Sequence, residues 1–188
     1  RVNAESFKDV RRSGIIAIKL SAGDELLSVL STNKGDTVTL ATAKGQSIRF
    51  KENDIREMGR TAGGVRAIKL GKGDSVIGAD AVRKEEEGVA ELLVLGAEGY
   101  GKKTKIKEYK VQKRGGSGIK TSKVTGKTGT LMVSRVLTDP ESEIVAISKQ
   151  GQVIRVSAGE IPSLGRQTQG VRIMKLRPGD SIASFAFL

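Results

Sequence analysis

A repeat of about 52 residues constrains the fold of this chain more than any other feature. The string G-x-x-A-I-K-L, in strong or weakened form, begins at four marker glycines: Gly14, Gly64, Gly118 and Gly170. Successive copies are 50, 54 and 52 residues apart. A second glycine marker follows the first three copies after 31 to 35 residues, at Gly45, Gly99 and Gly151. Because two independent markers keep one period, the chain is built from structural repeats.

Each repeat alternates short apolar or β-branched segments with glycine-containing turns, which predicts short β-strands. In the first repeat we expect strands at Ile15–Leu20, Glu25–Ser31, Thr37–Thr42 and Gln46–Phe50. We expect no long helix, only a helical turn near residues 53–58. The marker segments should occupy equivalent strands of successive repeats: Ile15–Leu20, Val65–Leu70, Ile119–Val124 and Val171–Leu176.

Several short strands per repeat are typical of a propeller-like array of blades. We therefore predict an all-β fold in one repeat domain spanning residues 1–188, with about three and a half to four four-stranded blades. The repeat units are expected at 1–50, 51–104, 105–156 and 157–188. Two β-sandwiches built from paired repeats are the alternative.

Composition limits the core and the chemistry. The core must be mainly aliphatic, because the chain has no Trp, four Phe and two Tyr. Cys and His are absent, which excludes disulfides and thiolate sites and removes the commonest general base and metal ligand. We expect no catalytic site, metal or cofactor, no membrane span, and a cytoplasmic location. Since Arg1 is not an initiator Met, we interpret the chain as a fragment.

Positive charge points to a polyanionic partner. The sequence has 33 Lys and Arg against 21 Asp and Glu, a net charge of +12. The excess is uneven, since residues 105–156 carry +7 whereas residues 51–104 carry none. Residues 102–127 contain ten basic side chains and Glu108 as the only acid. A disordered basic loop is one interpretation, but this run lies at the repeat phase of predicted strands, which favours an ordered binding surface.

Basic residues also recur at fixed phases of the repeat. A lysine lies five residues after every marker glycine, at Lys19, Lys69, Lys123 and Lys175. Further basic residues lie two residues after the glycine, at Arg66, Lys120 and Arg172, or shortly before it, at Arg11, Arg12, Arg60, Arg114 and Arg166. In a radial array these side chains would form a stripe along the rim, which suits the closely spaced phosphates of duplex DNA. The repeated lysine could instead protect an edge strand against aggregation.

The glycine-rich segment Gln112–Gly118, with the sequence QKRGGSG, is the most specific motif. It resembles the gyrase box, Q-[KR]-R-G-G-[KR]-G, of the C-terminal domain of DNA gyrase A. Six of its seven positions match, and Ser117 replaces a basic residue. The strings EGYGKKTKIKEYKV, REMGRTAGGVRAIKL and GRQTQGVRIMKL are similar to later blades of that domain, so the resemblance covers essentially the whole chain.

This resemblance implies a β-pinwheel that bends duplex DNA around its basic rim and supports ATP-dependent negative supercoiling. The partners would be DNA, the rest of gyrase A, and gyrase B, with ATP and magnesium bound elsewhere. In the family the principal box lies in the first blade, so QKRGGSG is interpreted as a copy in a later blade. The related C-terminal domain of topoisomerase IV, a protein-binding propeller-like scaffold and a hydrolase on such a scaffold are the alternatives.

The residues expected to contact DNA share a basic or glycine-rich character and the repeat phases described above. They are Arg11, Arg12, Lys19, Arg60, Arg66, Lys69, Lys102, Lys103, Lys105, Gln112, Lys113, Arg114, Gly115, Gly116, Gly118, Lys120, Lys123, Arg166, Arg172 and Lys175.

Overall fold

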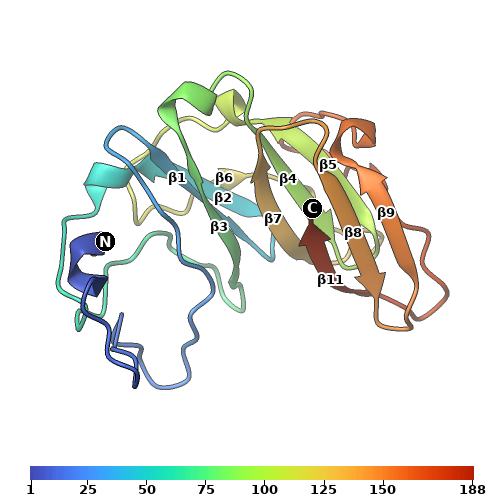
Figure 1. Cartoon of the computed structure of the whole chain (residues 1–188). Coiled ribbons are helices and arrows are strands. Elements are labelled where there is room, and N and C mark those ends of the chain that lie inside the picture. Colours follow the sequence, from blue (N-terminus) through green and yellow to red (C-terminus); the bar gives the residue numbers. More distant parts are fainter.

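The computed structural model describes all residues from 1 to 188, and it is an all-β protein (Figure 1). The strands are β1 (Thr37–Thr42), β2 (Gln46–Lys51), β3 (Val76–Val82), β4 (Glu91–Gly96), β5 (Tyr100–Lys105), β6 (Ile119–Lys120), β7 (Leu131–Leu137), β8 (Glu143–Ser148), β9 (Val153–Ser157), β10 (Val171–Arg172) and β11 (Ile182–Phe187). Five 3-10 helices of three or four residues complete it: η1 (Ala4–Phe7), η2 (Glu52–Asp54), η3 (Lys84–Glu86), η4 (Ile106–Glu108) and η5 (Ala158–Glu160). The expected absence of a long helix is confirmed. None of these helices is long or apolar enough to cross a membrane.

The strands form three antiparallel sheets that follow one another along an arch (Figure 1). Their strand orders are β3-β1-β2-β6, β7-β4-β5-β10 and β11-β8-β9. The central hairpins, β1–β2, β4–β5 and β8–β9, begin at residues 37, 91 and 143, which are 54 and 52 residues apart. The sheets therefore repeat with the period of the sequence markers.

Each blade takes its outer strands from later repeats. In the first blade, β3 pairs with β1, and the two-residue strand β6 pairs with β2. The second blade repeats this arrangement with β7 on β4 and β10 on β5. The register is also equivalent, because Ile119 lies opposite Ser47 and Val171 lies opposite Gly101. A blade is therefore not one contiguous segment of the chain. The boundaries of the four repeat units remain a prediction from the sequence.

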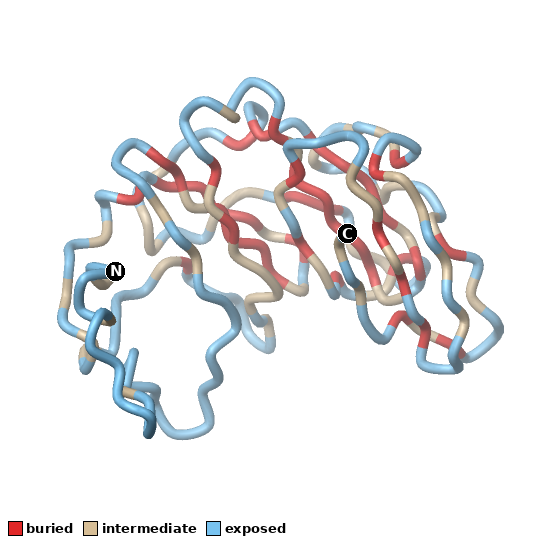
Figure 2. The backbone as a smooth tube through the Cα atoms, viewed as in Figure 1, coloured by how far each residue is buried: buried red, intermediate tan, exposed pale blue.

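Two of the predicted strands in the first repeat are wrong. Ile15–Leu20 and Glu25–Ser31 form an open segment without strand pairing, at the blue end of Figure 1, and Val65–Leu70 forms no strand either. The physical reason is strand exchange: Glu25–Ser31 lies about one period before β3, and the 188 residues contain no hairpin one period before β1–β2 to accept it. Val29 is consequently 82% exposed, and most of this segment is exposed in Figure 2. Three blades are formed, fewer than the expected three and a half to four.

The core lies between successive blades, as the buried strands in Figure 2 show. On β4, Leu92 and Val94 pack with Val82 and Tyr109, whereas Leu93 lies in a second cluster with residues of the third blade. Both faces of β4 are buried because a sheet lies on either side, which explains the unbroken apolar run in its sequence. The core is aliphatic as expected, and Phe50 and Tyr109 are its only buried aromatic residues.

Candidate nucleic-acid interface

The box segment, Gln112–Gly118, is ordered by backbone hydrogen bonds to earlier repeats. The N–H groups of Gln112 and Gly115 donate to the carbonyls of Arg49 and Ala67, over 2.7 and 2.6 Å. Gly118 has φ of +73°, and a Cβ there would lie 2.4 Å from the carbonyl oxygen of Ser47. Only glycine fits this backbone conformation and this close approach. The interpretation of this region as a disordered basic loop is therefore wrong.

The repeated lysine makes the same main-chain contact in three copies. In the next repeat, the turn that corresponds to the box segment supplies the carbonyl that accepts from this N–H. The bonds run from Lys19 to Ala62 (3.3 Å), from Lys69 to Gly116 (2.8 Å) and from Lys123 to Thr168 (3.1 Å). The lysine side chains themselves are exposed. The backbone thus fixes the spacing of successive lysines, while each ammonium group faces solvent.

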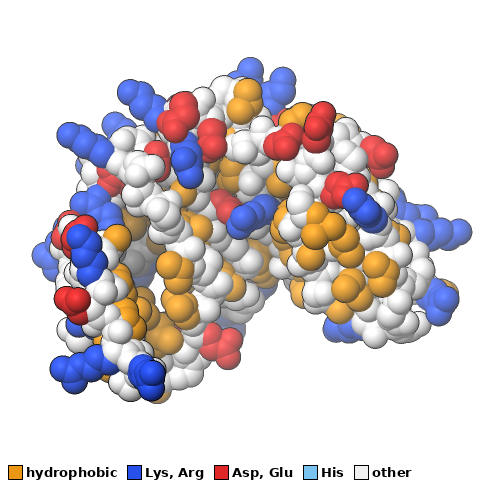
Figure 3. Space-filling model, in the orientation of Figure 1, with side chains coloured by type: hydrophobic (Ala, Val, Ile, Leu, Met, Phe, Trp, Pro, Cys, Tyr) orange, Lys and Arg blue, Asp and Glu red, His pale blue; other side chains and the backbone are white.

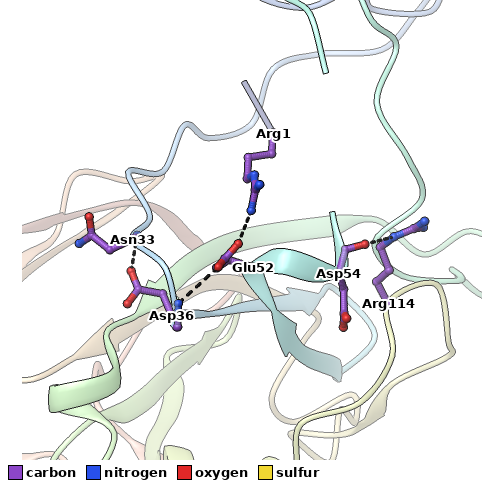
Figure 4. A network of polar contacts seen from close by, with 7 residues as sticks. Arg1, Asn33, Asp36, Glu52, Asp54 and Arg114 are labelled. Carbon is purple, nitrogen blue, oxygen red and sulfur yellow. Dashed lines mark hydrogen bonds and ion pairs between the residues drawn. The ribbon is translucent and has the colours of Figure 1, made fainter. Parts of the chain in front are cut away.

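The arginines that lie four residues before a marker glycine, Arg60, Arg114 and Arg166, connect neighbouring repeats. The sequence reasoning missed this role. Each guanidinium donates to the carbonyl two residues after the preceding marker glycine: Arg60 to Ile16 (3.1 Å), Arg114 to Arg66 (3.0 Å) and Arg166 to Lys120 (3.0 Å). Arg114 donates a second bond, from Nε to the carbonyl of Asp54 over 3.0 Å (Figure 4). A guanidinium has five N–H donors, so these bonds leave donors for a phosphate. The sequence feature that could have revealed this contact is the shared position of the three arginines, each four residues before a marker glycine.

The turn that contains Asp54 is also held from its other side. Glu52, in the same η2 helix, forms an ion pair with Arg1 and accepts a hydrogen bond from the N–H of Gly35 over 3.3 Å (Figure 4). Asp36 accepts from the N–H of Asn33 over 2.7 Å, which closes the turn before β1. The open N-terminal segment is thereby attached to the first blade at both of its ends.

Two of the predicted DNA contacts are interior residues. Lys102 is fully buried, and its Nζ donates to the main-chain carbonyls of Gly165 and Arg166. Burial lowers the pKa of Lys102 from its ordinary value of 10.5 to about 8. Lys103 is 6% exposed and its Nζ lies 3.2 Å from a carboxylate oxygen of Glu91. Neither ammonium group is free to meet a phosphate, because both strand positions of β5 face neighbouring elements.

Most of the other predicted basic residues are exposed and unpaired. They are Arg11, Arg12, Lys19, Arg66, Lys69, Lys105, Lys113, Lys120, Lys123, Arg172 and Lys175. None of them lies within 4.0 Å of an acidic side chain, since the ion pairs of the chain involve other residues. In Figure 3 most of the visible Lys and Arg side chains lie at the outer margin of the molecule. Of the remaining candidates, Gln112 has a buried side-chain nitrogen, and Gly115 uses its N–H internally.

A further group of cations surrounds Tyr100, the first residue of β5. The Nζ of Lys127 lies 5.1 Å from the centre of the Tyr100 ring, and the guanidinium carbon of Arg172 lies 5.6 Å from it. Arg172 also donates a hydrogen bond to the phenol oxygen over 3.1 Å, and this bond is the main cause that lowers the pKa of Tyr100. The sequence reasoning missed this cluster because its members lie far apart in the chain.

The repeated exchange of strands between repeats, together with many exposed cations that have no acidic partner, defines a propeller-like repeat module of basic character. The sequence matches the family described as DNA gyrase C-terminal domain, beta-propeller, over residues 1–33, 36–83, 90–132 and 142–188. The chain belongs to this family. The resemblance found in the sequence, and with it the all-β pinwheel fold class, is confirmed.

Individual relatives agree with this assignment. The chain is 37% identical over 186 residues to the DNA gyrase A protein of Staphylococcus epidermidis and 40% identical over 185 residues to that of Lawsonia intracellularis. These alignments cover 99% and 98% of this chain but 20% and 22% of the relatives, so the chain spans about a fifth of their length. A solved structure of a DNA gyrase A C-terminal domain is 28% identical with a TM-score of 0.80, over 94% of this chain and 58% of that one.

The topoisomerase IV alternative has a structural counterpart as well. A crystal structure of the C-terminal domain of DNA topoisomerase IV matches with a TM-score of 0.89, over 100% of this chain and 57% of that one. Its sequence identity is 18%, so this likeness shows a shared fold alone.

Proposed function

We propose that this chain is a DNA-binding and DNA-wrapping module of DNA gyrase A. It bends duplex DNA along the outer margin of its blades, and it thereby supports ATP-dependent negative supercoiling by the whole enzyme. The observation that carries the proposal is the set of exposed cations without an acidic partner, most of which recur at fixed phases of the repeat. Such a set neutralises successive phosphates of one duplex and releases their counterions, a contribution that does not depend on base sequence.

The structure changes which residues we assign to this surface. The exposed lysines and arginines make direct phosphate contacts. Within the box segment, Lys113 is the strongest candidate for such a contact, because its side chain is exposed and has no acidic partner. Arg60, Arg114 and Arg166 each hold a neighbouring repeat through one or two N–H groups and offer their remaining N–H groups to DNA. Lys102 and Lys103 act from the interior, by holding neighbouring segments in place. No α-helix offers a reading element for the major groove, so we expect binding to tolerate many sequences.

A salt titration tests the proposal. If about half of the 11 unpaired candidates contact phosphates, log K should fall against log salt with a slope of about −5 on a long duplex. Shorter duplexes, which reach fewer blades, should give smaller slopes. A slope near zero, independent of duplex length, would instead support the alternative of a scaffold that binds an acidic protein.

The other parts of the function follow from this assignment and are proposed with it. This chain has no catalytic group or cofactor of its own, and ATP and magnesium act on other parts of the topoisomerase. Its partners are duplex DNA, the remainder of gyrase A, and gyrase B, in the bacterial cytoplasm. Gyrase is favoured over topoisomerase IV because gyrase A proteins align over nearly the whole chain at 37–40% identity.

A further inference from the structure

The cluster around Tyr100 is assembled by the fold from three repeats. Tyr100 lies in the second repeat unit, Lys127 in the third and Arg172 in the fourth. The strand pairing of β5 with β10 brings Arg172 directly opposite Tyr100. Lys127 reaches the same ring from the turn that precedes β7. No carboxylate lies within 4.0 Å of either cation.

Two cations so arranged would repel each other, and the tyrosine offsets this repulsion. The face of an aromatic ring carries partial negative charge and attracts a cation within about 6 Å of its centre. Both cations meet this criterion, at 5.1 and 5.6 Å. The phenol oxygen accepts a hydrogen bond from Arg172, which restricts the guanidinium further. An aromatic ring satisfies the cations without neutralising their charge, so both remain available to an anion.

The same residues line a groove of about 470 Å³. Its walls add two more cations, Lys175 and Arg177, and its one acidic side chain is Glu98. Four positive groups against one negative group suit a phosphate. In the first blade, Gln46 occupies the position of Tyr100 in the hairpin register, so the aromatic ring is particular to the second blade.

We propose that this groove is a preorganised binding site for a backbone phosphate of duplex DNA, in which Tyr100 positions Lys127 and Arg172. The inference rests on the proposed function. It makes the second blade an anchoring point for DNA, although the second repeat unit carries no net charge. The relevant charge is supplied to that blade by residues of later repeats.

A substitution that leaves the charge unchanged tests the role of the ring. Tyr100→Leu should weaken binding to a long duplex about three- to tenfold at low salt and flatten the salt slope by about one unit. Tyr100→Phe retains the ring and should keep most of the slope. Gln46→Leu is the matched control, because it makes the same change at the equivalent position of the first blade and should leave affinity and slope at wild-type values.

A double-mutant cycle separates positioning from stability. The pair Lys127→Ala and Arg172→Ala should flatten the slope by about two units, and Tyr100→Leu added to that pair should cause no further loss. Urea unfolding of each variant identifies any loss of fold. An unchanged slope in Tyr100→Leu, or a full additional loss in the triple variant, would overturn the proposal while leaving DNA binding intact. A wild-type chain without a steep slope would reject the proposed function itself.

A free polyphosphate would meet the same cations, so a second arm of the experiment identifies the source of the phosphate. Inorganic tripolyphosphate is titrated into the wild-type chain and into Tyr100→Leu. We expect weak binding that is the same for both proteins, because the groove holds one phosphate of an extended duplex. Micromolar binding of tripolyphosphate that is lost in Tyr100→Leu would assign the groove to a small polyanion and overturn the DNA assignment.

Discussion

The buried Lys102 supports a prediction whose sign changes with pH. Its side chain occupies a position that is apolar in the other two blades, because the hairpin register aligns it with Ile48 on β2 and Ile154 on β9. The perturbation is Lys102→Met, which keeps the length of the side chain and removes its ammonium group. Wild-type Lys102 gains two hydrogen bonds to main-chain carbonyls, one of them 2.6 Å long to Arg166, but it is completely removed from water.

The magnitude follows from the pKa, which burial lowers from 10.5 to about 8. Between these values the unfolded chain holds the Lys102 proton and the folded chain does not, so the free energy of unfolding rises with pH across this window. The rise amounts to about 3 kcal/mol, at about 1.4 kcal/mol for each pH unit. Below pH 8 the folded protein bears this cost in full. Methionine bears no such cost but loses two hydrogen bonds, worth about 2 kcal/mol together.

Lys102→Met should therefore be more stable than wild type by about 1 kcal/mol at pH 7 and less stable by about 1.5 kcal/mol at pH 10.5, where most of the burial cost of wild-type Lys102 has disappeared. The assay is urea unfolding of both proteins at several pH values between 7 and 10.5. Lys110→Met, a change at an exposed lysine, is the control and should differ from wild type by a constant amount. A constant difference for Lys102→Met across the same range would refute the reasoning.

Three more predictions address other positions. Burial raises the pKa of Asp80 from 3.8 to about 6, so stability is lost as pH rises through that window; Asp80→Asn should remove this loss and stabilise the protein at pH 7.5 by about 1–3 kcal/mol in thermal or urea unfolding. Gly118→Ala should destabilise by about 2–4 kcal/mol, because φ is +73° and the new Cβ would lie 2.4 Å from a backbone oxygen, whereas Gly126→Ala, where the space is open, should change stability little. Lys113→Ala should flatten the salt slope by about one unit without changing stability, while Arg114→Ala should also cost about 1–3 kcal/mol of stability. Equal stability of the last two variants would contradict the role of Arg114 in joining repeats.

Much of the fold could be predicted from local pattern. The hairpin strands at residues 37–42 and 46–50 were expected close to where they occur, because a β-branched run, a glycine turn and a second run are sufficient to form them. The failure at Ile15–Leu20 and Glu25–Ser31 has a tertiary cause. Their patterns are those of strands, but a strand needs an acceptor edge, and strand exchange places that edge one or more repeats away.

The candidate site shows the same division between pattern and environment. The recurrence of basic residues at fixed phases identified the exposed lysines, because the repeat alone places equivalent residues at equivalent edges. Burial could not be predicted for Lys102, whose sequence context resembles that of its exposed neighbour Lys105. The packing of the turn at Gly165 against β5 decides it, and that contact spans more than 60 residues of chain.

The sequence by itself determined the period, the all-β character, the aliphatic core and the net positive charge of this protein. These properties depend on residue type and spacing, which act locally or sum over the whole chain. Only the tertiary structure decided which repeat supplies which strand, which lysines are buried, and that cations from two later repeats contact the ring of Tyr100. Those outcomes depend on which distant segments come into contact. Hydrogen bonding between repeats determines these contacts, because every exchanged strand satisfies its backbone groups on a hairpin from an earlier repeat.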